Sequence, residues 1–313
     1  MTMLKRTLMA SAIAFAAAGA AQAGEIAVIV KTTNSNFWQN VNKGAQAAIE
    51  GQSEHTMSFD GPAAESAIAD EVNLVENAIN RGVAGIVLAP SDPDALVPVV
   101  KRANENGIPV VIIDSMLADG AKGTYQAFLS TDNCAAGEEV AKRMIKDAGE
   151  TGKVAIMSYV AGVGSEIGRV GCFTDYLKKN SKLEIVGPLY SQSQMATALN
   201  QTTDVLSANP DLVGIFGANE PTAVGMGRAI VQAGKAGQLT ALGFDGNADL
   251  QQFVRDGVLE ATAVQGSFAM GEKGVKTVID LLAGKTVEDF INTGVVLVDK
   301  ENIDSDEAKN VLY

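Results

Sequence analysis

The sequence is poor in the residue types that metal sites, hydrolase sites and nucleic-acid-binding surfaces require. Its 313 residues include one histidine and two cysteines, and its 24 lysines and arginines are outnumbered by 37 aspartates and glutamates. A lone histidine and two distant cysteines cannot form a Cys/His metal site, and the sequence contains no G-x-S-x-G motif. The formal charge of -13 opposes binding to nucleic acid or to an anionic membrane, because both carry negative charge.

The two cysteines, Cys134 and Cys172, leave one structural question open. They could form a disulfide if the chain is exported to an oxidising compartment. The sequence alone does not decide whether their Cα atoms approach closely enough for a bond.

The first 23 residues predict a secretory signal peptide. Lys5 and Arg6 precede an apolar, alanine-rich run at 8–18, and the tripeptide Ala-Gln-Ala at 21–23 has the small-x-small pattern of a cleavage site. The apolar run is too short to span a membrane as a helix. We therefore expect cleavage after Ala23 and export of the remaining chain.

Beyond residue 24, apolar runs of strand length alternate with amphipathic segments of helix length. The short links between them predict parallel strands with right-handed crossovers. The pattern restarts near 126 and the chain is longer than one ordinary domain, so we expect an α/β fold with two doubly wound parallel-sheet halves. The expected strands lie at 26–30, 55–59, 83–88, 108–113, 126–129, 153–157, 184–189, 212–216, 239–243 and 261–264. The expected helices include 40–50, 63–81, 96–106 and 134–148.

The segment 31–38, directly after the first expected strand, carries an unusual set of side chains. It offers the amine of Lys31, the hydroxyl of Ser35 and the adjacent rings of Phe37 and Trp38, the only tryptophan of the chain. Ligands of open α/β sheets bind at the carboxyl ends of strands. Flat rings beside hydrogen-bonding groups suit a small polyhydroxylated molecule. Alternatively, Phe37 and Trp38 begin the core face of the next helix.

Three further polar side chains, Asp114, Asn219 and Asp245, directly follow expected strands. A single polar residue in such a loop ordinarily caps a helix. Several that converge at one edge of a sheet indicate a binding site, and ionised carboxylates form strong hydrogen bonds with hydroxyl groups. Asp132 precedes an expected helix, so for this residue a cap is as good an interpretation as a ligand contact.

The glycine-rich segment 162–168 follows an expected strand and opens a helix, as a dinucleotide-binding loop does. Its spacing is G-x-G-x-x-x-G, and Glu184 lies roughly where an acidic ribose ligand would be expected. An exported protein has no ready supply of nicotinamide cofactor. We therefore do not expect a dinucleotide site.

Seven short motifs, none of them decisive alone, occur in a consistent order along the chain. They are Lys31-Thr32 with 34–38, 108–110 with Asp114, 130–133, Ala161-Gly162 with Arg169, 218–220, 243–246 and Gln265. Together they closely resemble the ribose/allose-type periplasmic sugar-binding proteins, the soluble receptors of bacterial ABC importers. The resemblance covers about 25–298.

The resemblance implies the fold of a type I periplasmic binding protein, in which two α/β lobes joined by three crossing strands close on a sugar. It places the crossings near 131–132, 265–266 and 292–294. It implies an N-terminal lobe of 24–131 plus 266–293 and a C-terminal lobe of 132–265 plus 294–313, after a signal peptide at 1–23.

The resemblance also implies the roles of individual residues. Phe37 and Trp38 would hold the sugar ring between them, and Lys31 matches the lysine of the allose-type opening loop. The residues implied to bind sugar hydroxyls are Asp114, Arg169, Asn219, Asp245 and Gln265.

The chain departs from the family pattern at three places. Ser115 stands where ribose receptors carry an arginine, Ser35 replaces an asparagine, and 191–194 lacks the aromatic residue usual there. We include Ser35 and Ser115 among the expected ligand contacts. Because the pocket is less charged and less aromatic, we expect a ligand other than ribose, such as another pentose, a ketose, a hexose or a linear polyol.

Several of these side chains also allow a structural interpretation. Arg169 could form a surface salt bridge, Lys31 could be solvated, and Gln265 could serve the hinge at its crossing. Glu166 and Glu220 could line the mouth of the site.

The leading functional hypothesis is a periplasmic receptor that binds a monosaccharide or polyol and delivers it to the membrane permease of an ABC importer. It implies no catalysis, cofactor or metal, a monomeric chain, and a chemotaxis receptor as a second candidate partner. An exported carbohydrate-active enzyme with Asp114 and Asp245 as its carboxylate pair is the alternative. A sugar-responsive transcription regulator shares the architecture, but the signal peptide and the lack of a basic headpiece oppose it.

Overall fold

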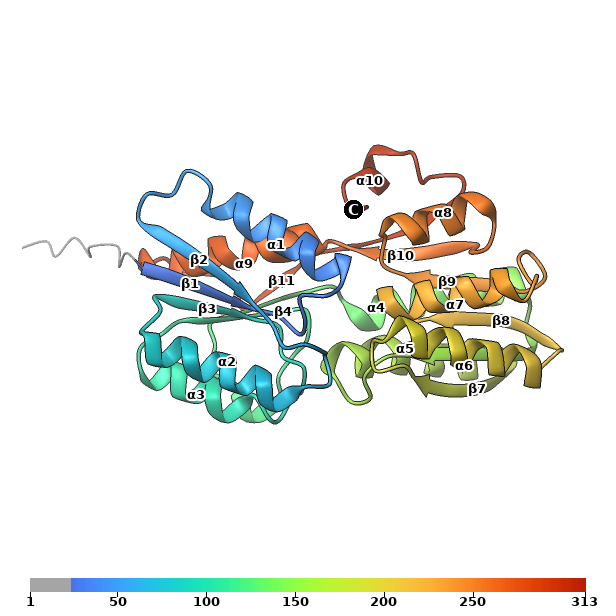
Figure 1. Cartoon of the computed structure of the whole chain (residues 1–313), viewed down its shortest axis with the longest axis horizontal. Coiled ribbons are helices and arrows are strands. Elements are labelled where there is room, and N and C mark those ends of the chain that lie inside the picture. The colour runs from blue at the N-terminus through green and yellow to red at the C-terminus, as the bar shows by residue number, and fades with distance from the viewer. Residues whose placement is uncertain (1–23) are drawn as a thin grey trace, which may run out of the picture.

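The structure, a computed structural model, describes residues 24–313 (Figure 1). The expected signal peptide and its cleavage after Ala23 lie outside the described residues. The described chain forms two α/β lobes that lie side by side along the long axis of the molecule, each built on a six-stranded sheet. None of the described helices is long and apolar enough to cross a membrane.

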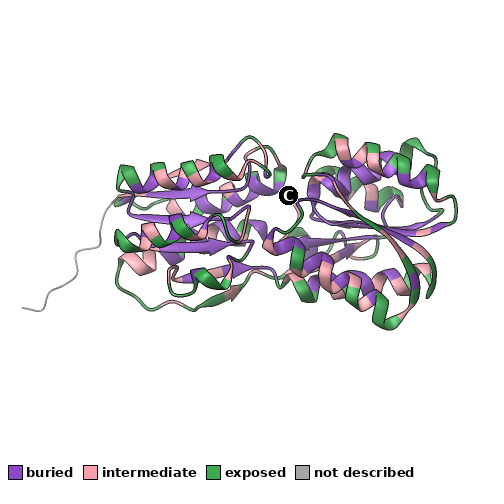
Figure 2. Ribbon diagram, turned by 90° about the horizontal axis from the view of Figure 1, so that it is seen from below, coloured by how far each residue is buried: buried purple, intermediate pink, exposed green. Residues whose placement is uncertain are grey.

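The sheet of the first lobe is entirely parallel. Its strands, in spatial order, are β11 (Phe290–Asn292), β5 (Ala127–Ser130), β4 (Val110–Ile113), β3 (Gly85–Leu88), β1 (Gly24–Ile29) and β2 (His55–Asp60). Every residue of β3 and β4 is buried, as expected for parallel strands covered on both faces. Figure 2 shows this burial along the strands and the exposed outer sides of the helices.

Helices cover both faces of the first sheet. Helices α1 (Asn36–Ile49) and α9 (Ser267–Leu282) pack with Ile26 and Val28 of β1, whereas α2 (Ile68–Arg81) and α3 (Val97–Glu105) pack with Ala27 and Ile29. Since successive strand residues point to opposite faces, the first pair of helices lies on one side of the sheet and the second pair on the other (Figure 1). A short 3-10 helix, η1 (Asp119–Ala121), precedes β5.

The second lobe repeats this arrangement with one antiparallel edge strand, β12, which pairs with β10. Its strands, in spatial order, are β12 (Val295–Asp299), β10 (Ala261–Gln265), β9 (Thr240–Phe244), β8 (Leu212–Gly217), β6 (Thr151–Ser158) and β7 (Lys182–Tyr190). Helices α4 (Asn133–Ala148) and α5 (Gly164–Asn180) pack on one face. On the other face lie α6 (Met195–Ala208), α7 (Glu220–Gln232), α8 (Ala248–Asp256) and α10 (Asp306–Lys309).

The chain passes between the two sheets three times: from β5 to α4, from β10 to α9, and from β11 to β12. Two of these crossings are joined by a hydrogen bond from Thr131 Oγ1 to the carbonyl of Gly294 (3.1 Å). The backbones also approach closely, because a Cβ at Gly266 would lie 2.3 Å from the carbonyl oxygen of Thr293. Only glycine fits at this point.

Two helices begin at residues other than those expected. Helix α1 begins at Asn36, because the hydroxyl of Ser35 accepts a hydrogen bond from the backbone N–H of Trp38 (3.3 Å) and caps it. The polar loop that was expected to reach Trp38 is therefore shorter. Helix α2 begins at Ile68 and not at Ala63, which leaves the residues before it in a turn at the edge of the lobe.

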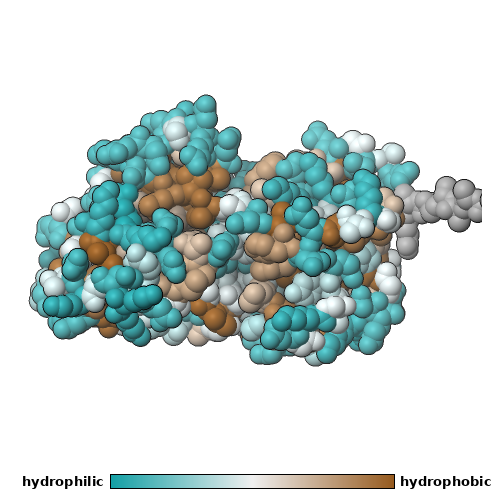
Figure 3. Space-filling model, turned by 180° about the vertical axis from the view of Figure 1, so that it is seen from behind, coloured by the Kyte–Doolittle hydropathy of each residue, from teal (hydrophilic) through white to brown (hydrophobic). Residues whose placement is uncertain are grey.

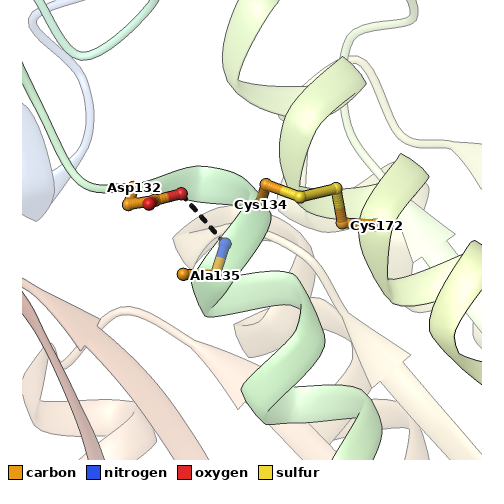
Figure 4. Close-up of a disulfide and its surroundings, with 4 residues drawn as sticks. All are labelled: Asp132, Cys134, Ala135 and Cys172. Atoms are coloured by element: carbon orange, nitrogen blue, oxygen red, sulfur yellow. Dashed lines mark hydrogen bonds between the residues drawn. A yellow bond between two sulfur atoms is a disulfide. The ribbon is translucent and has the colours of Figure 1, made fainter.

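The two cysteines form a disulfide that joins the first turn of α4 to α5 (Figure 4). The Cα atoms of Cys134 and Cys172 are 5.1 Å apart, within the usual range. Beside them, Asp132 caps α4 by accepting a hydrogen bond from the N–H of Ala135 (3.0 Å). The structure therefore gives Asp132 the role of a helix cap.

Seen from behind, the surface is mostly hydrophilic, and its hydrophobic residues gather in patches (Figure 3). Among residues 24–313, the exposed large hydrophobic side chains are Met116, Ile167, Met195, Val231, Phe268 and Phe290.

One fully buried carboxyl group of the first lobe, that of Glu71 on α2, makes stability depend on pH. Its Oε2 accepts a hydrogen bond from the N–H of Ser91 (2.9 Å), whereas Oε1 has no partner among residues 24–313. Burial raises the pKa of Glu71 from 4.5 to about 7. Between these values the folded chain binds more protons than the unfolded chain, so the free energy of unfolding falls as the pH rises.

We expect Glu71→Gln to remove the contribution of this group to the pH dependence. At pH 8 the variant should be more stable than the wild type by about 1–3 kcal/mol, and at pH 4.5 the difference should be much smaller. Urea unfolding at the two pH values measures both quantities. Glu76→Gln is the matched control, because Glu76 is a half-buried carboxylate of the same helix, paired at the surface with Arg102 (3.2 Å). An unchanged pH dependence in Glu71→Gln would contradict the assignment.

Candidate ligand-binding site

A small cavity lies between the lobes, where the carboxyl ends of strands from both sheets meet. Nine of the ten residues expected to contact a ligand line it: Lys31, Ser35, Phe37, Trp38, Asp114, Arg169, Asn219, Asp245 and Gln265. Five further lining residues were not among them: Glu65, Tyr159, Ser165, Glu220 and Pro221. Both lobes contribute to the wall, which is rich in hydrogen-bonding groups.

On the first-lobe side, a buried ion pair forms the floor of the cavity. Lys31 Nζ donates to Asp114 Oδ2 and to the hydroxyl of Ser115, both at 2.6 Å. Lys31 is only 2% exposed, so it is not a solvated surface lysine. Ser115 is fully buried and does not line the cavity; it lies behind the pair and donates to the same Asp114 oxygen (2.9 Å).

The two carboxylates at the ends of strands share an uncommon backbone conformation. Asp114 has a φ of 62° and Asp245 a φ of 79°, in the left-handed region that non-glycine residues seldom adopt. Such conformations concentrate at functional sites, where the surrounding structure holds them. Asp114 lies in the first lobe and Asp245 in the second, so the cavity has one such carboxylate on each side.

Phe37 and Trp38, in the first turn of α1, supply the aromatic part of the wall. Their ring centroids are 4.8 Å apart and their planes are nearly perpendicular, at 87°. They therefore cannot present two parallel faces on opposite sides of a sugar ring. Both rings are also part of the first-lobe core. Phe37 and Trp38 therefore belong to the core face of the helix and line the cavity as well.

In the second lobe, the guanidinium of Arg169 is fixed on three sides. Its Nε and Nη2 donate to Asn133 Oδ1 (3.1 and 2.7 Å), and Nη1 donates to the carbonyl of Ala218 (2.7 Å). The group lies over the ring of Phe244, 3.6 Å from its centroid. Arg169 is 2% exposed and forms no salt bridge with a residue of 24–313, which leaves its remaining N–H groups available to a ligand.

Asp245 is held by its neighbours and fully enclosed. Its Oδ2 accepts the backbone N–H of Glu220 (2.8 Å), and its Oδ1 accepts from Gln265 Nε2 (2.9 Å). Burial raises the pKa of Asp245 to about 6, although Arg169 and these two donors favour the ionised form. Gln265 Oε1 is buried and has no partner among residues 24–313, a costly state that a ligand hydroxyl would relieve.

Hydrogen bonds between the lobes close the cavity. Glu220 Oε1 accepts the N–H of Asn36 in the first turn of α1 (3.0 Å), and Glu65 Oε2 accepts from the hydroxyl of Ser193 (2.6 Å). Burial, with the neighbouring charge of Asp245, raises the pKa of Glu220 to about 7. The structure is therefore that of a closed form.

A third closing contact runs from the N–H of Ser165 to the hydroxyl of Ser115 (3.2 Å). Tyr159 donates to the hydroxyl of Ser165 (3.0 Å) on the same wall. The sequence pattern did not indicate Tyr159 or Ser165 as ligand contacts. Tyr159 lies in the loop after β6 and Ser165 in the first turn of α5. Neither has a charge or belongs to a pair of adjacent rings, the features that marked other residues of the site.

The glycine-rich segment after β6 does not form an open phosphate-binding loop. Glu166 Oε2 accepts the N–H of Gly162 (3.3 Å), and its Oε1 accepts from Ser158 Oγ (3.0 Å). Glu166 thus occupies the loop and does not line the cavity. A carboxylate at this position would repel a pyrophosphate. Within residues 24–313, no group of three or more His, Cys, Asp or Glu side chains is placed to hold a metal ion.

Two doubly wound lobes, closed over a small polar cavity with aromatic and charged groups, define the class of two-lobed solute receptors. Comparison with known proteins supports this: residues 26–286 match the model of the periplasmic binding protein domain. The D-allose-binding periplasmic protein of Escherichia coli is 33% identical, over 87% of each chain. The ribose import binding protein RbsB of the same organism is 30% identical, over 96% of this chain and 100% of RbsB.

Among solved structures, an ABC transporter solute-binding protein from Agrobacterium vitis with bound D-fucose is 73% identical, with a TM-score of 0.92 over 93% of this chain and 100% of that one. The chain belongs to the periplasmic binding proteins, among the sugar-binding components of ABC importers. These relatives are transport receptors, so the alternative of a carbohydrate-active enzyme is not supported.

Proposed function

We propose that this chain captures a neutral monosaccharide between its lobes and delivers it to the membrane permease of an ABC importer. The observation that carries the proposal is the buried Oε1 of Gln265, which has no partner among residues 24–313 and belongs to the wall of a cavity whose other polar groups are already oriented. A sugar hydroxyl that donates to this oxygen would satisfy it. Groups from both lobes then bind one ligand, which excludes water and stabilises the closed form.

The charges of the cavity favour a neutral sugar over an anionic one. Four carboxylates and two cations line it, and Lys31 is already paired with Asp114. Arg169 is the one cation without a carboxylate partner among the described ion pairs of the cavity. A uronic acid or a sugar phosphate would therefore meet net repulsion.

The relative with bound D-fucose supports a 6-deoxyhexose as the ligand, because it shares 73% of its residues with this chain. We propose that Trp38 packs on the sugar and that its hydroxyl groups are bound by Asp114, Arg169, Asn219, Asp245 and Gln265. Ser35 would orient the opening turn of α1, and Ser115 would hold Lys31 and Asp114 in place. Micromolar affinity requires about -8 kcal/mol, which several charge-assisted hydrogen bonds and one aromatic contact can supply.

We further propose that the lobes, 24–131 with 266–293 and 132–265 with 294–313, move as units about the three crossings. The closed form would be the state that the permease recognises, and a chemotaxis receptor could recognise the same state. The chain would act as a monomer in the periplasm after cleavage following Ala23.

A thermal-shift panel on the mature protein, unfolded and refolded to remove any bound ligand, tests the proposal. It should include D-fucose, D-galactose, D-allose, D-ribose, D-arabinose, sorbitol and D-galacturonate. A ligand at 100 times its dissociation constant adds about 2.7 kcal/mol to stability, so D-fucose or a close stereoisomer should raise the melting temperature by several degrees. We expect no shift with D-galacturonate. A panel without any shift from a neutral sugar would refute the proposed function.

A further inference from the structure

Glu65 is the residue through which side chains of the two lobes are linked at the cavity. Its Oε2 accepts a hydrogen bond from Ser193 Oγ of the second lobe (2.6 Å). Within residues 24–313 this is the only hydrogen bond between side chains of the two lobes outside the crossings. The other closing contacts each involve a backbone N–H.

The other oxygen of the same carboxylate orients the tryptophan ring. Trp38 Nε1 donates to Glu65 Oε1 (3.0 Å), and Ser193 Oγ in turn accepts from Asn219 Nδ2 (3.0 Å). Trp38 and Asn219, at the two ends of this chain of hydrogen bonds, both line the cavity. The carboxylate thus connects a first-lobe ligand contact with a second-lobe one.

The hydrogen bond between Glu65 and Ser193, here called the link, lies between the cavity and the outer surface. Glu65 lines both the closed cavity and a wider groove outside it, and Ser193 lines that outer groove. Glu65 is 7% exposed, and a hydrogen bond to an ionised carboxylate is stronger when it is buried. The fold also holds Gln192 and Ser193 at left-handed φ values of 57° and 54°, which non-glycine residues seldom adopt without a local reason.

One part of this hydrogen-bonded series is present in both the open and the closed form, and the other part is present only in the closed form. The bond between Trp38 and Glu65 lies within the first lobe, so it is present whether the lobes are open or closed. The bond between Glu65 and Ser193 exists only when the lobes are closed, and it must break before a ligand can leave through the outer groove. The link therefore acts on the rate of ligand release and not on the encounter with the ligand.

We propose that Glu65 is a positioning residue that fixes the Trp38 ring in the first lobe and, through Ser193, holds the second lobe closed with Asn219 against the ligand. This inference rests on the proposed function. It predicts that Glu65 and Ser193 act as one unit in slowing the release of the sugar. It also predicts that the two residues contribute little to association, because the open form meets the ligand before the link is made.

Stopped-flow measurement of D-fucose association and dissociation tests the proposal on the wild type, Glu65→Gln, Ser193→Ala and the double variant. Each single variant should raise the dissociation rate constant by about tenfold or more and change the association rate constant by less than about threefold. The double variant should dissociate no faster than the faster single variant, because residues of one network are not additive. Glu76→Gln, at a half-buried carboxylate of the same lobe that does not line the cavity, should leave both rates unchanged.

A second readout separates this role from a merely structural one. The emission of Trp38 in the ligand-free protein should be the same in Ser193→Ala as in the wild type, because the first-lobe bond remains. Faster dissociation with unchanged emission supports the coupling. Additive effects in the double variant, or single variants indistinguishable from Glu76→Gln, overturn the inference while wild-type binding stands. A wild type that binds none of the sugars in the panel overturns the proposed function and this inference with it.

Discussion

Replacing Asp245 with alanine is expected to raise the dissociation constant for the sugar by roughly 10²- to 10⁴-fold. The carboxylate is fixed by the N–H of Glu220 and by Gln265 Nε2, so its remaining lone pairs point into the cavity in a set geometry. Two lost hydrogen bonds to an ionised group, at about 1.5–3 kcal/mol each, account for this range. Isothermal titration calorimetry measures the change directly.

Asp256→Ala is the matched control for this variant. Asp256 is an exposed aspartate of the same lobe, bonded to Gln252 on the surface of α8. The control should bind as the wild type does. An Asp245→Ala protein that has a native circular dichroism spectrum and wild-type affinity would remove Asp245 from the site.

Replacing Trp38 with alanine is expected to weaken binding by roughly 10²-fold or more. The indole is the largest aromatic side chain among the residues that line the cavity, and burying an aromatic side chain against a ligand contributes about 2–3 kcal/mol. Trp38 is 2% exposed and packs in the first-lobe core, so the variant should also lose stability. Calorimetry is the suitable measurement, since Trp38 is the only tryptophan and the variant loses its fluorescence.

Trp38→Phe separates the role of the ring from that of the fold. It retains an aromatic face but removes the Nε1–H that Glu65 accepts, so its affinity should lie between those of the wild type and Trp38→Ala. Phe290→Ala, at an exposed aromatic residue on β11, controls for the general loss of a ring. Wild-type affinity in Trp38→Ala would exclude the proposed packing on the sugar.

The fold follows from the sequence because its main signal is local. Apolar runs such as 110–113 have the length and β-branched composition of buried parallel strands, and the short connections between strands and helices leave few topologies. The same logic found Asp114 and Asp245, since the carboxyl ends of parallel strands meet at one edge of a sheet. Family motifs located Arg169 and Gln265.

The closing contacts could not be predicted in this way. Glu65 lies three residues before Ile68, in a turn that the sequence pattern assigned to a helix. Its role as a closing contact depends on its distance to Ser193 in the other lobe. For Glu220 the sequence indicated only a place at the mouth of the site, and its contact with the first turn of α1 in the other lobe required the structure. Likewise, the pairing of Cys134 with Cys172 required the approach of α4 and α5 in three dimensions.

The central claim, that one neutral sugar is held by groups from both lobes, is tested most directly by calorimetric titration of D-fucose into the ligand-free mature wild type, Trp38→Ala and Asp245→Ala. The account predicts one site per chain with micromolar or tighter affinity in the wild type, and a large loss of affinity when either lobe's residue is removed. Wild-type affinity after the loss of one of these residues in a folded protein, or a wild type that binds D-galacturonate but no neutral sugar, would contradict it.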